Sequence, residues 1–177
     1  MRRCQMRSLF LWLVLATTAV CGPAAAGPWE FGVYTGYQRA GSSRVSGIDP
    51  GGVGAFLFST EWDGQSFEMP PYLGVRLVYW HSAREGLSLE FTHAKIAADG
   101  TAAAANGFSR LEFTSGLNTL TANYTRRWPG AGRWLPYGGA GVGLSVPHVR
   151  VTSAGGATSG YQLAGPAVTL YGGAARP

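Results

Sequence analysis

Apolar and polar residues alternate along several segments of about ten residues, as expected of β-strands with one apolar and one polar face. In "WEFGVYTGYQ", aromatic and aliphatic residues from Trp29 to Tyr37 alternate with glycine and polar residues. "YLGVRLVYW" and "GLSLEFTHAK" repeat the pattern. The alternation predicts six strands, over residues 29–38, 72–80, 87–95, 114–128, 135–149 and 167–175.

The connections between these strands alternate in length. Residues 82–86 and 129–134 are short links, whereas 39–71, 96–113 and 150–166 are long and rich in Gly, Ser and Ala. Short periplasmic turns and long extracellular loops are typical of outer-membrane barrels. Aromatic residues near the short links predict an interfacial girdle there, made of Trp80, Trp128, Trp134 and Tyr137.

We therefore predict an all-β fold, an antiparallel transmembrane β-barrel of the OmpA/OmpX type. Such barrels have at least eight strands, so six strands ending near Pro177 predict a C-terminally truncated, incomplete barrel domain over residues 27–177. "GAFLFSTEWDG" predicts a hairpin inside the first long loop, closing on Asp63-Gly64. A soluble sandwich or lipocalin-like barrel is the structural alternative.

The N-terminus predicts an export signal over residues 1–26. Arg2, Arg3 and Arg7 precede an apolar run from Leu9 to Val20, and Ala24-Ala25-Ala26 offers a cleavage site before Gly27. A membrane-anchoring helix needs a longer run, and lipoprotein processing at Cys21 would need a smaller residue than Val20. We therefore expect the protein in the cell outer membrane.

Composition supports a membrane location and disfavours other classes. Charged residues make up 13% of the chain, against about 25% in soluble domains. Both cysteines, Cys4 and Cys21, lie in the predicted signal, so the mature chain has no disulfide or thiolate site. Without the three signal arginines, 11 basic residues face 9 acidic ones, which removes the argument for nucleic-acid binding. The glycines of "GGAGVGLS" (138–145) alternate with apolar residues and are interpreted as inward-facing strand residues, not as a phosphate loop.

Polar residues follow the apolar face of three neighbouring strands towards the long loops. After Leu87, Leu89 and Phe91, the same face continues with His93 and Lys95. The same parity predicts an outward-facing polar band at the outer-leaflet level, made of His93, Lys95, Asn118, Glu112, Arg110, His148 and Arg150.

The residue types in this band suggest two kinds of chemistry. Lys95, Arg110 and Arg150 can bind lipid phosphate. His93 and His148, with Glu112 or Glu68, can bind a divalent metal. Glu68 of "SFEMPPY" lies at the rim, where a carboxylate can act as base or ligand, and ordinary solvated or lipopolysaccharide-binding rim residues are the alternative.

Several segments resemble the outer-membrane lipid A oxidase family of small barrel proteins: "FEMPPY", "FTHAK", "RLEFTSGLNTLT", "PYGGAGVGLSVPHV" and "YQLAGPA". The resemblance covers most of residues 29–167. It implies oxygen-dependent oxidation of the proximal glucosamine of lipid A to aminogluconate, with release of peroxide. It also implies a divalent metal and no flavin or nicotinamide.

On physical grounds we take Glu68, Glu112 and Asn118 as catalytic candidates, His93 and His148 as metal ligands, and lipid A as the partner of a monomeric, membrane-embedded chain. Two other functions stay open. One is a non-catalytic structural or ligand-binding outer-membrane barrel. The other is a lipid A deacylase using a histidine with Ser145, although Ser145 and His148 have opposite parity.

Overall fold

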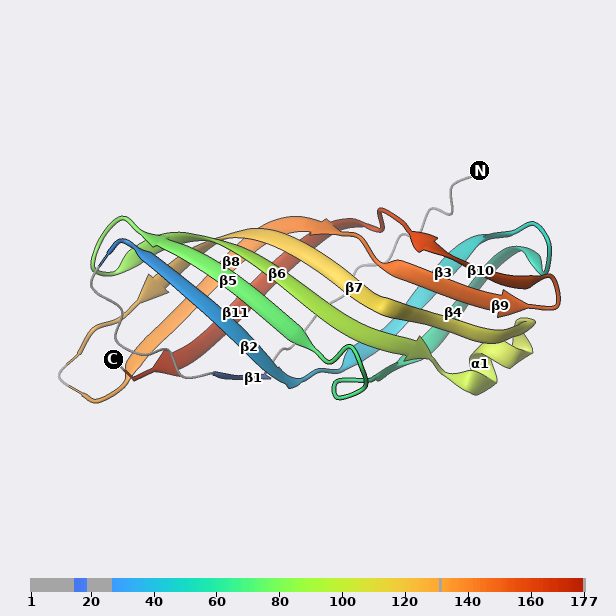
Figure 1. The fold of residues 1–177 in the computed structure, drawn as a ribbon, viewed down its shortest axis with the longest axis horizontal. Helices are drawn as coiled ribbons and strands as arrows, with labels where there is room; N and C mark the ends of the chain where they lie inside the picture. Colours follow the sequence, from blue (N-terminus) through green and yellow to red (C-terminus); the bar gives the residue numbers. More distant parts are fainter. Residues whose placement is uncertain (1–14, 19–26, 131, 177) are drawn as a thin grey trace.

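A computed structural model describes residues 15–18, 27–130 and 132–176. These residues form eleven strands of one antiparallel sheet and a single short helix (Figure 1). The strands are β1 (Leu15–Thr18), β2 (Trp29–Tyr37), β3 (Ala40–Asp49), β4 (Gly54–Gly64), β5 (Leu73–Trp80), β6 (Glu85–Ala98), β7 (Phe108–Arg127), β8 (Leu135–Ser145), β9 (His148–Ser153), β10 (Gly156–Tyr161) and β11 (Gly165–Ala175), and the helix is α1 (Gly100–Ala105). The predicted signal lies outside the described residues except for β1.

One half of the molecule, which we call the turn half, contains the six predicted strands. They appear as β2, β5, β6, β7, β8 and β11, each hydrogen-bonded to the next in that order, which confirms the all-β antiparallel prediction. The sheet curls strongly, since the guanidinium of Arg76 on β5 lies 4.0 Å from the ring centroid of Tyr171 on β11. Within the described residues the sheet is not closed, and β1 and β11 are its two edges.

The other half, which we call the hairpin half, contains segments that we predicted to be loops. β3 pairs with β4 and β9 pairs with β10, and these hairpins continue the sheet on either side of the ends of β6 and β7 (right side of Figure 1). The predicted turn at Asp63-Gly64 is wrong. Residues 54–64 form one strand, and its hairpin turn lies at residues 50–53, before the strand begins.

Two strand interruptions face each other where the halves meet. Ala94 of β6 pairs with Leu117 of β7, and Ile96 pairs with Phe113. Three residues of β7 therefore lie opposite one residue of β6, which makes a bulge in β7. The predicted strand 135–149 is broken at Val146-Pro147, because proline has no N–H for the ladder. Asn118 O accepts the Val146 N–H at 2.8 Å and closes the gap.

The polarity of the two faces reverses between the halves. In the turn half the outward residues are apolar and exposed, as with Leu89, Leu120 and Val142, while inward Glu90 and Asn123 are buried. In the hairpin half the interior is apolar and contains Val45, Trp62, Ile96, Leu111, Phe113, Leu117 and Val149. Its outer face is mostly polar, with Ser59, Glu61, Asp63, Arg110 and Arg150 exposed and with Ile48, Leu57 and Tyr161 as exposed exceptions on its strands.

Aromatic side chains gather at the short-turn end, but not all those that we predicted. Trp128 and Trp134 are exposed, and Trp29 and Tyr79 join them with ring centroids 4.8 Å apart. Trp80 instead stacks on the guanidinium of Arg127, with Arg127 Cζ 4.0 Å from the centroid of the Trp80 ring. Tyr137 faces the interior. In the described part of the chain, no helix is long and apolar enough to cross a membrane.

Candidate functional site

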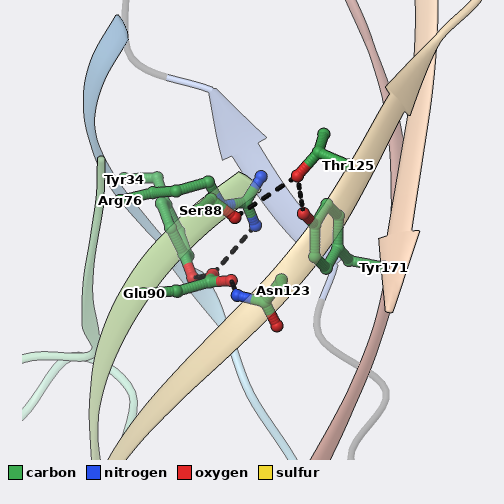
Figure 2. Close-up of polar contacts among 7 residues, drawn as sticks. All are labelled: Tyr34, Arg76, Ser88, Glu90, Asn123, Thr125 and Tyr171. Carbon is green, nitrogen blue, oxygen red and sulfur yellow. Dashed lines mark hydrogen bonds and ion pairs between the residues drawn. The ribbon is translucent and has the colours of Figure 1, made fainter. Parts of the chain in front are cut away.

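The interior of the turn half contains a hydrogen-bonded polar network (Figure 2). Glu90 on β6 is 4% exposed and lies directly across from Arg76 on β5, whose Nη2 is 2.9 Å from Glu90 Oε1. The same carboxylate accepts the Tyr34 hydroxyl from β2 and the Asn123 amide from β7, the latter at 3.4 Å. Side chains from four strands therefore form one network, in which the charges of Arg76 and Glu90 balance.

A second set of contacts lies beside this network and includes Tyr171 of β11, whose ring contacts the Arg76 guanidinium. The hydroxyl of Thr125 bonds to the Tyr171 hydroxyl and lies 3.3 Å from Ser88 Oγ (Figure 2). The Tyr171 ring lies against Gly139, where an added Cβ would come within 2.4 Å of that ring, so only glycine fits at this position. This agrees with the predicted inward position for Gly139, whereas Gly138 has the opposite parity and lies beside the exposed Trp128.

The hydrogen bonds within the network leave the Glu90 carboxylate little capacity to act as a catalytic group. Glu90 already accepts bonds from three donors, and its charge is balanced by Arg76. Between the network and the apolar interior of the hairpin half lies a cavity of about 140 Å³, lined by Tyr72, Thr92, Thr119 and the inner edge of β11 among others. Burial raises the pKa of the Tyr72 phenol to about 12, so it stays protonated at neutral pH.

On the outer face, His93 and Asn118 form the predicted polar pair. They are direct cross-strand neighbours, and His93 Nδ1 lies 2.9 Å from Asn118 Oδ1. The Asn118 amide nitrogen donates to Ser115 O at 3.1 Å and Val146 O at 3.3 Å, so its oxygen faces the imidazole. His93 Nδ1 therefore carries a proton and donates it to Asn118 Oδ1, which leaves Nε2 as the free position of the ring.

The bulge in β7 shapes the surroundings of His93. Gly116 has φ +85°, and a Cβ there would come within 2.3 Å of the imidazole ring, so the ring occupies the space that a side chain at residue 116 would need. His93 Nε2 is buried and has no protein hydrogen-bond partner. A buried ring nitrogen in such a position can form a hydrogen bond with a bound water or ligand group.

The remaining predicted residues form separate pairs. Lys95 Nζ bonds to Glu68 Oε2 at 2.9 Å, and Arg110 Nε bonds to Glu112 Oε2 at 3.0 Å. Arg150 is exposed and lies opposite Glu112 in the register. His148 is half-buried, with its ring centroid 4.8 Å from that of Tyr161.

The described residues do not fit the implied divalent metal. None of them gather into a group of three or more His, Cys, Asp or Glu side chains that can hold an ion. Glu68 and Glu112 are engaged with Lys95 and Arg110 instead. We therefore derive no step through a metal.

Sequence reasoning missed the interior network, although a signal was present. The link 82–86 is short, so β5 and β6 pair closely around it, and Trp80 lies opposite Gly86. Counting four residues back from Trp80 and four on from Gly86 places Arg76 opposite Glu90. An inward arginine facing an inward glutamate at equal distance from a short turn predicts a buried ion pair.

The chain was also compared with known proteins. No family model matches it, and neither the curated proteins nor the solved structures contain a significant match.

Proposed function

We propose that this chain is an outer-membrane β-barrel protein whose turn half crosses the membrane and whose hairpin half projects from the outer leaflet. The observation that carries the proposal is the reversal of polarity between the halves. An apolar exterior around a polar interior suits lipid, whereas a polar exterior around an apolar interior suits water.

Strand lengths support the same proposal. β2, β8 and β11 have 9, 11 and 11 residues, and about 9 to 11 residues are needed for a tilted strand to cross the hydrocarbon core. The exposed rings of Trp29, Trp128 and Trp134 at the short-turn end match an interfacial girdle. A soluble barrel rarely exposes an apolar surface as large as this belt.

A matched pair of lysine substitutions tests the membrane location. Leu89 and Leu57 are 56% and 64% exposed, the first in the belt and the second in the hairpin half. In a membrane, we expect Leu89→Lys to lower the free energy of unfolding by about 2–4 kcal/mol, and Leu57→Lys to change it by less than about 1 kcal/mol. Urea titrations in lipid vesicles measure both. Equal, small effects would contradict the proposal, because exposed leucines on a soluble protein tolerate lysine.

We propose oxidation of lipid A as a second, more specific function. It rests on the resemblance to the lipid A oxidase family and on His93, whose unpartnered Nε2 lies at the boundary between the halves. With Nδ1 held by Asn118, the imidazole presents Nε2, the nitrogen that can accept the proton of a sugar hydroxyl. The net reaction oxidises the reducing-end hemiacetal of the proximal glucosamine by two electrons. Dioxygen takes these two electrons, together with two protons from the C1–H and O–H of the hemiacetal, and becomes hydrogen peroxide, and water opens the resulting lactone to aminogluconate.

In this scheme Asn118 positions His93 and does not react. All the polar atoms of its side chain are already used, by the imidazole and by two backbone carbonyls. Lipid phosphate would contact the cations Lys95, Arg110 and Arg150. At Lys95 and Arg110 the phosphate would compete with the carboxylate that each already contacts.

Mass spectrometry of lipid A tests this activity. Aerobic Gram-negative cells that express the chain are expected to gain one oxygen on the proximal sugar, and His93→Gln is expected to lose most of that product, because general-base catalysis contributes about 10²–10⁴-fold. Ser109→Ala, an exposed change in the hairpin half, serves as the control. Unmodified lipid A from a correctly inserted protein would leave the non-catalytic barrel as its function.

A further inference from the structure

The connection between β4 and β5, residues 65–72, lies beside Lys95 of β6 at the boundary between the two halves. Its ends are fixed by backbone bonds, from Gln65 N to Lys95 O at 3.0 Å and from Tyr72 N to Ser66 O at 2.8 Å. Ser66 is buried, and its hydroxyl accepts the Gln38 N–H at 2.9 Å. The base of this connection is therefore held firmly against the sheet.

The tip of the same connection is apolar and exposed. Phe67 is 77% exposed and Met69 is 81% exposed, and they flank Glu68, which reaches back to Lys95 Nζ. Two large apolar side chains held outward on a fixed base are costly in water, so their exposure calls for an apolar partner.

The position of the tip indicates what that partner is. The outward residues of the neighbouring strands, Leu73 on β5 and Phe91 on β6, belong to the apolar belt, and Phe91 is followed on the same face by His93 and Lys95. The tip therefore adjoins the end of the belt, at the level where apolar residues give way to charged ones. In an outer leaflet this is the level at which acyl chains meet phosphorylated headgroups.

We propose that Phe67 and Met69 form a lipid-inserted anchor that grips the phosphorylated glycolipid of the outer leaflet. The two side chains enter the acyl-chain region. Lys95, which now pairs with Glu68, contacts a lipid phosphate instead. Lys95 suits this exchange because its side chain is 13% exposed beneath a Glu68 side chain that is 61% exposed. The inference rests on the proposed membrane location and assigns the lipid contact to one segment.

Site-directed spin labels test where the tip lies. In a full-length Cys4→Ser, Cys21→Ser background the chain has no other cysteine, so single cysteines can be placed at Phe67, Met69, Leu120 and Leu57. Leu120 is the belt reference and Leu57 the hairpin-half reference, with 55% and 64% exposure. Power-saturation measurements in purified outer membranes compare access to oxygen, which concentrates in lipid, with access to a nickel chelate, which stays in water.

Labels at Phe67→Cys and Met69→Cys are expected to match Leu120→Cys, with high oxygen and low nickel access. If they match Leu57→Cys while Leu120→Cys still reports lipid, the anchor is wrong and the membrane location stands; a protein partner for the tip would give this result. If Leu120→Cys itself reports water, both proposals fail together.

A binding measurement tests the glycolipid contact separately. Removing the two apolar side chains that would insert among the acyl chains is expected to raise the apparent dissociation constant for fluorescent lipopolysaccharide about tenfold. The variant is Phe67→Ser with Met69→Ser, the control is Leu57→Ser, and Lys95→Gln tests the phosphate contact. An unchanged constant in Phe67→Ser/Met69→Ser would overturn the glycolipid assignment.

Discussion

Replacing Arg76 with leucine is expected to lower the free energy of unfolding by about 3–5 kcal/mol, because the buried Glu90 carboxylate loses its counter-ion. Glu90 is 4% exposed, and its remaining donors, Tyr34 and Asn123, are neutral. Stacking of the guanidinium over the Tyr171 ring would also be lost. Equilibrium urea titrations in lipid vesicles measure the change.

Two further variants separate the buried ion pair from a general effect of removing charge. Arg126→Leu is the matched control, since Arg126 and Glu85 are both substantially exposed and their atoms are 3.8 Å apart. It should cost less than about 1 kcal/mol. The double variant Arg76→Leu/Glu90→Leu should be more stable than Arg76→Leu alone, because no unpaired charge remains. A double variant as unstable as the single one would show that packing, and not the charge, explains the loss.

The strands of the turn half could be predicted because their alternation is clear and their links are short. Leu87, Leu89 and Phe91 are exposed and Ser88 and Glu90 are buried, as parity requires. The outward His93–Asn118 pair followed from the same parity. The contact between Glu68 and Lys95 could not be predicted in this way, because Glu68 reaches Lys95 from an irregular connection whose path no periodicity describes.

In the hairpin half, the first hairpin was predicted with its turn in the wrong place, and the other strands were missed for a different reason. Its strands are rich in Gly, Ser and Ala, which have low strand propensity and resemble loop composition. β10, with the sequence "GATSGY", has almost no apolar alternation and is held by its pairing with β9. The bulge at residues 114–116 and the break at Val146-Pro147 also change the register, so parity counted across them is not reliable evidence for the positions of Glu112 and His148.

Replacing Phe113 with alanine is expected to destabilise the hairpin half by about 3–5 kcal/mol, the usual cost of emptying an aromatic core position. Phe113 is fully buried, and its ring stacks on Trp62 with centroids 5.0 Å apart. Ile96 and Val149 lie directly beside it in the sheet. These contacts all belong to the hairpin half, so the loss should open that half while the ion-pair network of the turn half persists.

Limited trypsin digestion in intact membranes distinguishes local opening from global unfolding. In Phe113→Ala, cleavage after Arg44, Arg110 and Arg150 should become much faster, while the turn half keeps its resistance to unfolding in cold detergent. Phe91→Ala is the control, because Phe91 is 39% exposed on the outer face and its removal leaves no interior cavity. If Phe113→Ala instead unfolds both halves together, the expectation is contradicted. The apolar interior and the polar network would then form one cooperative unit.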